Sequence, residues 1–170
     1  MSRWPDITDR LTVDPTAYIS PRAYVVGTVT IGVDSSVWPM VSIRGDEGEI
    51  VIGSRTNVQD GCVLHADSDA YLTIGDGVTL GHGAIVHGCT IEDDVLIGMG
   101  AVVLNHARIG SGSIVAARAL VPEGMIVPPG SIVLGVPGRI KPMRSEQRDR
   151  ITTPAAHYVA LKALYMGRDE

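Results

Sequence analysis

Three of the five histidines in the sequence, His65, His82 and His87, lie within a stretch of 23 residues. Neutral imidazole nitrogens bind zinc, and three of them around an open fourth position form a catalytic site, whereas a structural site closes with a fourth protein ligand. The same nitrogens also accept Fe²⁺ or Co²⁺. The alternative interpretation is an ordinary surface histidine, which is what we expect of His106 and His157. The fold must bring the three rings together before they can hold a metal ion.

The segments that must position these histidines repeat every six residues. Counting in sixes with three breaks reaches twenty marker positions, all of them valine, isoleucine or leucine: Val13, Ile19, Val25, Ile31, Val37, Ile43, Ile52, Val58, Leu64, Ile74, Leu80, Val86, Ile91, Ile97, Val103, Ile109, Val115, Val121, Val127 and Val133. This period predicts short strands joined by turns, three strands to a coil. We expect successive coils to hydrogen-bond at the strand spacing of ~4.8 Å, with the markers stacked inside a prism. A β-sandwich, the alternative fold, would show mixed spacings.

The composition agrees with one stacked domain and excludes several classes of protein. The 170 residues include 20 glycines, no phenylalanine and only 4% aromatic residues, whereas an irregular core uses large aromatic side chains to fill its space. The net charge of −5 argues against a nucleic-acid-binding surface. No segment approaches the ~20 apolar residues of a membrane span, and residues 1–10 are too polar for a signal peptide. We therefore expect a cytoplasmic protein with no nucleic-acid or membrane partner.

Glycine and cysteine each have an expected structural role. Two cysteines, Cys62 and Cys89, are too few for a disulfide framework. Although Cys89 lies two residues from His87, we expect it to be a buried, inert thiol. Glycine directly follows a marker at six places, which we attribute to turns that need a positive φ angle: Gly32, Gly53, Gly75, Gly81, Gly98 and Gly110.

The repeat ends near Val133, and the sequence after it has helical character. A turn-rich exit at residues 135–139 precedes a helical stretch from Ser145 to Lys162, in which Pro154 predicts either two helices or a kink. The predicted fold class is all-β, with a parallel β-helix domain over residues 11–138 and a C-terminal helical segment over residues 144–166. We expect this helix to pack along the outside of the prism through five apolar residues: Ala156, Val159, Ala160, Ala163 and Leu164.

The three breaks in the rhythm all follow the third marker of a coil, so they fall on one corner of the prism. Three residues are inserted after Ile43, four are inserted after Leu64, and one is deleted after His87. Insertions confined to one edge of a repeat fold usually build a site there. His65 and His87 occupy the same position in successive coils at this corner, so we expect their Cα atoms about one strand spacing apart.

His82 lies on the preceding side of the predicted prism. From there it cannot readily reach a metal ion held by His65 and His87 of its own chain, but it can reach one in a neighbouring copy when three prisms pack edge to edge. The spacing therefore predicts a homotrimer with three equivalent sites. Each site takes two ligands from one subunit and one from the next.

Polar residues at the equivalent positions of neighbouring coils are expected to support this site. Arg44 lies one coil before the first histidine of the pair, and Asp60 lies on the side of the prism that carries His82. We expect Arg44 and Asp60 to pair across the subunit boundary, with Asp46 as a second partner, and a purely structural ion pair is the alternative. Gln59 is expected to orient a hydroxide at an open zinc position by hydrogen bonding.

The sequence resembles the gamma-class carbonic anhydrases and their short relatives. The matching stretches are residues 43–48 (IRGDEG), 57–66 (NVQDGCVLHA), 81–88 (GHGAIVHG), 97–101 (IGMGA) and 135–138 (GVPG). The resemblance covers about residues 10–165 and implies a left-handed parallel β-helix with the C-terminal helix packed alongside.

The resemblance also implies a site and an activity. Zinc is expected at the trimer interface, held by His65, His87 and the neighbour's His82. The implied reaction is the reversible hydration of CO₂ to bicarbonate by a zinc-bound hydroxide, with Gln59 orienting the hydroxide and Arg44 assisting bicarbonate binding. Three further residues are expected to shape the pocket and the interface: Asp46, Asn57 and Asp60.

The sequence departs from the active members of that family in the loop after the first histidine ligand. Those members carry a long acidic loop with a glutamate that shuttles protons, whereas residues 66–71 here include only Asp67 and Asp69. Short-loop relatives are often weak or inactive hydratases, and some act on other small molecules. Glu47 and Tyr158 are the candidate proton carriers that remain.

Two other functions fit the same repeat. An acyl-CoA-dependent acyltransferase shares the prism and the trimer, but it uses one histidine on a long loop and needs no metal. A zinc-binding trimeric scaffold with weak or no hydratase activity would keep the ligands without the chemistry. Bound zinc on the purified protein separates the first alternative from the metal-dependent functions.

Overall fold

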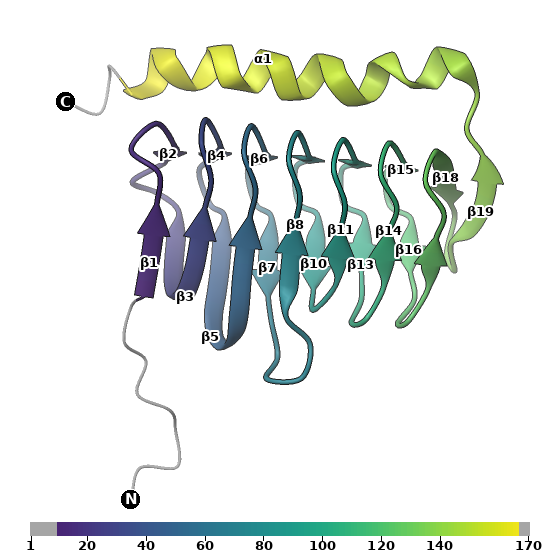
Figure 1. The fold of residues 1–170 in the computed structure, drawn as a ribbon, viewed down its shortest axis with the longest axis horizontal. Helices are drawn as coiled ribbons and strands as arrows, with labels where there is room; N and C mark the ends of the chain where they lie inside the picture. The colour runs from purple at the N-terminus through teal and green to yellow at the C-terminus, as the bar shows by residue number, and fades with distance from the viewer. Residues whose placement is uncertain (1–9, 167–170) are drawn as a thin grey trace, which may run out of the picture.

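The computed structural model describes residues 10–166, which form a parallel β-solenoid with one α-helix along its side (Figure 1). The predicted all-β fold with a C-terminal helix is confirmed. After the strands come the 3-10 helix η1 (Ser145–Gln147) and the helix α1 (Asp149–Met166). The strands are β1 (Arg10–Val13), β2 (Tyr18–Ile19), β3 (Tyr24–Ile31), β4 (Ser36–Val37), β5 (Ser42–Ile52), β6 (Asn57–Val58), β7 (Val63–His65), β8 (Leu72–Ile74), β9 (Thr79–Leu80), β10 (Ile85–His87), β11 (Thr90–Ile91), β12 (Leu96–Ile97), β13 (Val102–Val103), β14 (Arg108–Ile109), β15 (Ile114–Val115), β16 (Leu120–Val121), β17 (Ile126–Val127), β18 (Ser131–Leu134) and β19 (Arg139–Pro142).

The strands form the three faces of a prism. One face is a sheet that contains, in spatial order, β2, β4, β6, β9, β12, β15, β18 and β19. The other sheet makes the two remaining faces, because the long strands β3 and β5 continue around a corner and pair with strands on both sides of it. The paired strands are parallel, apart from β18 and β19 at the end, as stacking of successive coils requires.

The repeat markers form the core. All but three of the twenty are buried, and the exceptions, Val13, Ile19 and Val25, belong to the first coil of the described residues 10–166. Markers of successive coils lie side by side, as Ile43 does with Leu64. The core is therefore a stack of equivalent aliphatic layers.

The glycines that follow the markers serve a different purpose from the predicted one. These six glycines have no positive φ angle, and the left-handed positions lie further along the turns, for example at Gly112 (φ 63°) and His106 (φ 59°). A Cβ atom on Gly98 would lie 2.4 Å from the backbone nitrogen of Ala117, far inside the 3.4 Å at which ordinary contact begins. Glycine is used here because the next coil passes too close for a side chain.

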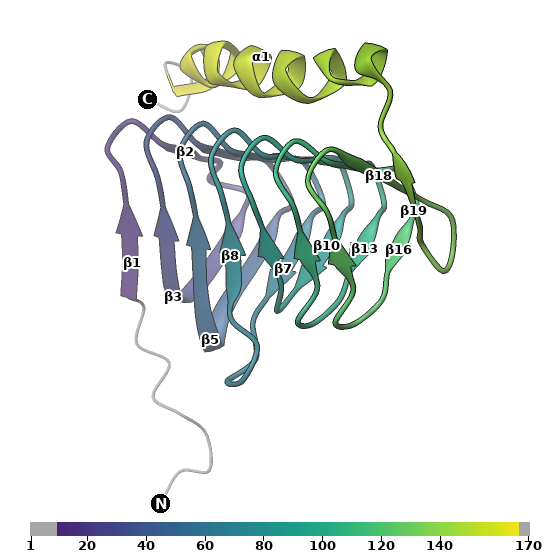
Figure 2. The same cartoon turned by 45° about the vertical axis from the view of Figure 1, so that its right-hand side comes forward.

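Helix α1 lies along the sheet that contains β2 and β18 (Figure 2) and contacts β4, β6 and β9 of that sheet. The side that it turns inward is not the predicted one. The chain continues through Pro154 as one helix, so of the two predicted alternatives the division into two helices is wrong and a kink stays a prediction. Four of the five residues predicted to pack are exposed: Ala156, Ala160, Ala163 and Leu164. The buried and half-buried side consists mainly of Ile151, Ala155, Tyr158, Lys162 and Tyr165. Aromatic rings carry more apolar area than alanine, so they determine the orientation.

Four of the seven aromatic residues lie on this helix or beneath it: Tyr18, Trp38, Tyr158 and Tyr165. The ring of Trp38 lies 5.7 Å from Tyr18, 5.1 Å from Tyr158 and 4.9 Å from Tyr165, measured between ring centroids. Trp38 Nε1 also donates a hydrogen bond to Ser36 Oγ at 3.0 Å. Edge-to-face contacts of this kind stabilise the docked helix beyond the area that they bury.

A buried lysine connects the C-terminal part of α1 to the first two coils. Lys162 Nζ donates a hydrogen bond to the carbonyl oxygen of Thr16 at 2.6 Å and lies 3.0 Å from Asp34 Oδ1. The amine is satisfied by a carbonyl and a carboxylate, as a buried charge must be. The last helical turns are thereby attached to the first two coils.

Candidate metal centre

His65 and His87 end neighbouring strands at one corner of the prism. They are paired directly in the register of β7 and β10, and Arg44 pairs with His65 from the coil before. The four-residue insertion forms a turn that projects from this corner (Figure 1), closed by the paired backbones of Asp67 and Ala70. The predicted register of the two histidines is confirmed.

The two imidazole rings face each other through one nitrogen each. His65 Nδ1 lies 2.9 Å from His87 Nε2. The outer nitrogens both have other partners, because His65 Nε2 lies 3.1 Å from Asp46 Oδ1 and His87 Nδ1 lies 2.5 Å from Asn105 Oδ1. His65 is buried and His87 is half-buried, so the pair is accessible from one side.

The outer contacts determine where the protons lie. Asn105 Nδ2 donates to Asp67 Oδ2 at 2.8 Å, so the atom that Asn105 turns to His87 is its oxygen. Carboxylate and amide oxygens only accept hydrogen bonds, and the outer nitrogen of each neutral ring must therefore carry the hydrogen. The inner nitrogens then oppose each other with lone pairs, which is unfavourable unless a proton or a metal cation lies between them. The pair fits a metal ion, because imidazole binds metals through this lone pair while its other N–H is held by an acceptor.

A carboxylate lies beside the two rings. Asp67 Oδ1 is 3.8 Å from His65 Nδ1, and one potential ligand atom from each of His65, Asp67 and His87 can be chosen so that all three lie within 4.8 Å of one another. Within residues 10–166, this is the one group of three or more histidine, cysteine and acidic side chains with such spacing.

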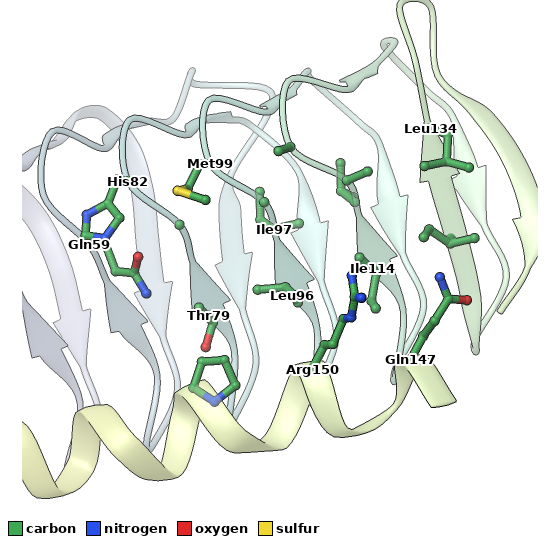
Figure 3. A pocket seen from close by; sticks show the side chains of 17 residues that line it. Gln59, Thr79, His82, Leu96, Ile97, Met99, Ile114, Leu134, Gln147 and Arg150 are labelled. Carbon is green, nitrogen blue, oxygen red and sulfur yellow. The ribbon is translucent and has the colours of Figure 1, made fainter. Parts of the chain in front are cut away.

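His82 lies on another face of the prism. Its Nδ1 is 3.1 Å from Asp60 Oδ2, and both side chains are about half exposed. In Figure 3, His82 and Gln59 stand at one end of a groove of about 540 Å³ between α1 and the sheet, whose floor is mainly apolar. His82 and Asp60 share one side, as the spacing predicts, and this side is separate from the histidine pair in one protomer.

Two predicted residues near the histidine pair, Arg44 and Asp46, form a series of polar contacts with His65. Arg44 Nη1 lies 2.9 Å from Asp46 Oδ2, so the Asp46 carboxylate contacts Arg44 through one oxygen and His65 through the other. Glu47 is the next residue of β5 and is exposed. The pair between Arg44 and Asp60 of a neighbouring subunit stays a prediction.

Other predicted residues lie on the side of His82. Gln59 is buried, and its Nε2 donates to Asn57 Oδ1 at 3.0 Å. Tyr158 belongs to the aromatic contacts of α1, and burial, with the nearby carboxylate of Asp60 as a smaller cause, raises its pKa. In a single protomer neither Gln59 nor Tyr158 lies at the histidine pair, so a role there requires a neighbouring subunit.

Sequence reasoning missed Asn105 and treated Asp67 only as a loop residue. His87 lies one position after the marker Val86, and the same count one coil later leads to Leu104. Asn105 is two positions after the marker Val103, so counting repeats would not have found it. Asp67 belongs to an insertion, where counting repeats does not predict the direction of a side chain.

The two cysteines are buried in the core and are not among these candidate ligands. Burial raises the pKa of Cys62 to about 11 and that of Cys89 to about 12. Both thiols therefore stay protonated at neutral pH, and the predicted burial of Cys89 is confirmed. Zinc binds the thiolate form, so the metal centre depends on imidazole and carboxylate groups.

Comparison with known proteins places this geometry in a family. Residues 88–123 match the family described as bacterial transferase hexapeptide (six repeats). A probable carbonic anhydrase of Methanocaldococcus jannaschii is 49% identical over 144 residues, which are 84% of this chain and 91% of that protein. The chain belongs to the gamma carbonic anhydrase-like family of hexapeptide-repeat proteins. The mitochondrial gamma carbonic anhydrase 2 of Arabidopsis thaliana is 36% identical over 160 residues, covering 90% of this chain and 58% of that protein.

Other relatives of the family carry different names. The carnitine operon protein CaiE of Escherichia coli is 39% identical over 127 residues, covering 75% of this chain and 65% of that protein. The chain thus spans less than two thirds of CaiE and of the plant protein. The crystal structure of a Bacillus cereus protein, named a putative acetyltransferase, is 35% identical and superposes with a TM-score of 0.90 over 92% of both chains.

None of the helices described within residues 10–166 has the length and apolar character needed to cross a membrane.

Proposed function

We propose that the protein is a metal-dependent, carbonic anhydrase-like enzyme that hydrates CO₂ reversibly to bicarbonate at a site between subunits of a homotrimer. The observation that carries the proposal is the opposed pair of nitrogens, His65 Nδ1 and His87 Nε2, 2.9 Å apart. Both lone pairs point inward, because Asp46 and Asn105 accept hydrogen bonds at the outer nitrogens. The family relationship supports a metal at this place.

The residues of the corner have separate tasks in this proposal. His65 and His87 hold the metal, which supplies Lewis acidity and makes a water molecule nucleophilic near neutral pH. Asp46 orients His65 through one oxygen and Arg44 through the other. Arg44 is 45% exposed, so its guanidinium is available to bind the bicarbonate anion. Glu47, exposed beside Asp46, is the proposed proton carrier of this corner.

The third imidazole is proposed to come from a neighbouring subunit. His82 is half exposed and its Nδ1 faces Asp60, which leaves Nε2 as the nitrogen available to a metal of the adjacent protomer. The partner would bring Gln59 and Tyr158 with it, because these residues lie on the same side of the prism. Zinc is the proposed metal, and Fe²⁺ or Co²⁺ fit the same ligand types.

The test is to measure metal content and CO₂ hydration on the same anaerobic preparation. We expect about one metal ion per protomer and a hydration rate above background, both lost in His87→Ala. His157→Ala is the matched control, because His157 is exposed on α1 away from the pair, and it should retain both. Metal without hydration would remove the hydratase while leaving the metal site, and absence of metal from the parent protein would overturn the proposal.

An acyl-CoA-dependent acyltransferase is the second candidate, favoured by the likeness to the Bacillus cereus protein named a putative acetyltransferase. The groove beside α1 (Figure 3) would then be the acyl-donor site, since its floor is apolar and Arg150 stands at its edge. An acyltransferase needs no metal, so its activity would survive chelation. Transfer of an acetyl group from acetyl-CoA by chelator-treated protein would support this candidate, and the same assay without acetyl-CoA is its control.

A further inference from the structure

The short loop after His65 places a carboxylate beside the histidine pair. Asp67 is the second residue after His65, and its side chain is only 33% exposed. Its Oδ1 lies 3.8 Å from His65 Nδ1, the nitrogen whose lone pair faces His87. The paired backbones of Asp67 and Ala70, with N–H to O=C bonds of 3.1 Å in both directions, hold the loop in this position.

Asn105 fixes the direction of the Asp67 carboxylate. Its Nδ2 donates to Asp67 Oδ2 at 2.8 Å, and its Oδ1 accepts from His87 Nδ1. One amide therefore orients both the His87 ring and the Asp67 carboxylate. The other carboxylate oxygen, Asp67 Oδ1, is left to face the two opposed histidine nitrogens. This is the arrangement in which a metal ligand is held by a hydrogen-bonding neighbour that does not touch the metal.

We propose that Asp67 is a metal ligand supplied by the same protomer as His65 and His87. This inference rests on the metal site of the proposed function and extends its ligand set. Each subunit then presents two imidazole nitrogens and one carboxylate oxygen before any partner docks, and the partner's imidazole adds a fourth ligand. Four protein ligands close a zinc site, whereas catalysis needs an open position. If all four bound a zinc ion, Asp67 would occupy the position that water needs, and the carboxylate would have to release the metal before water could bind there.

The experiment compares two variants of the same loop with the full-length parent. Asp67→Asn removes the charged ligand with little change in shape, and Asp69→Asn makes the same charge change at an exposed neighbouring position. Affinity for Zn²⁺ and Co²⁺ is measured by competition with a chromophoric chelator, and the visible absorption spectrum of bound Co²⁺ reports the ligand set. Thermal unfolding of the metal-free proteins checks that both variants fold.

We expect Asp67→Asn to lower metal affinity at least tenfold and to change the Co²⁺ spectrum, and Asp69→Asn to leave both as in the parent. His82→Ala should keep a bound metal, because the three ligands of one protomer remain. Equal affinities and spectra for the parent and Asp67→Asn would overturn this inference while leaving the histidine site intact. A parent protein that binds neither metal would instead overturn the proposed function.

Discussion

Replacing Gly98 by alanine tests whether the glycines after the markers are required by the close approach of the next coil. The new Cβ would lie 2.4 Å from the nitrogen of Ala117, about 1 Å short of ordinary contact at 3.4 Å. The neighbouring coil must move away by this amount, which stretches the 2.7 Å hydrogen bond from Gly98 N to the oxygen of Val115 beyond bonding distance. Losing one buried backbone bond and leaving its groups unpaired costs about 3 kcal/mol.

Gly112→Ala is the matched control. Gly112 has a φ of 63° and open space around its Cβ position, so alanine there costs only the left-handed conformation, ~1–2 kcal/mol. Thermal unfolding should therefore show a Tm decrease of roughly 6–12 °C for Gly98→Ala and roughly 2–8 °C for Gly112→Ala, at ~2–4 °C per kcal/mol for a chain of this size. If Gly112→Ala is the more damaging of the two, turn conformation and not coil contact explains the glycines.

Three further predictions concern the metal, the thiols and one carboxylate. Zinc at a hundred times its Kd should stabilise the parent by ~2.7 kcal/mol, a Tm increase of roughly 5–11 °C that a chelator reverses; an equal increase in His87→Ala would place the ion elsewhere. Because burial raises the pKa values of Cys62 and Cys89, iodoacetamide at pH 8 should label neither thiol until urea unfolds the protein, and rapid labelling of the folded protein would contradict this. Hydrogen bonds from the backbone and hydroxyl of Ser111 lower the pKa of Glu92, so its contribution to stability is present above the unfolded value of about 4.3 and is lost as the pH falls below it. Between pH 5 and pH 3 the Tm of Glu92→Gln should therefore fall less than that of the parent, and parallel curves would show that Glu92 has no part in acid unfolding.

The parts of the structure that follow from a strict repeat could be predicted from the sequence. The burial of the markers and the alignment of His65 with His87 both follow from counting, because every coil adds the same number of residues between equivalent positions. The separation of His82 from that pair follows for the same reason. These predictions needed no knowledge of how any side chain is oriented.

Predictions failed where the outcome depended on contacts between elements. The inward side of α1 was wrong because Tyr158 and Tyr165 pack on Trp38, a contact that hydropathy along the helix does not reveal. The glycine after each marker was assigned to turn conformation, since the distance to the next coil is visible only in three dimensions. Asp67 lies in an insertion, so no count could predict that Asn105 would turn its carboxylate toward the histidines.

The bond between Lys162 and Thr16 joins residues that are 146 positions apart. Solenoid coils can form one after another as the chain is synthesised, because each coil contacts only its neighbours. The surface around Tyr18 and Trp38, however, stays uncovered until the final helix has left the ribosome. The first coils to be synthesised are thus the last to be covered. A nascent chain that stalls before α1 exposes an aromatic patch to which chaperones or other unfolded chains can bind.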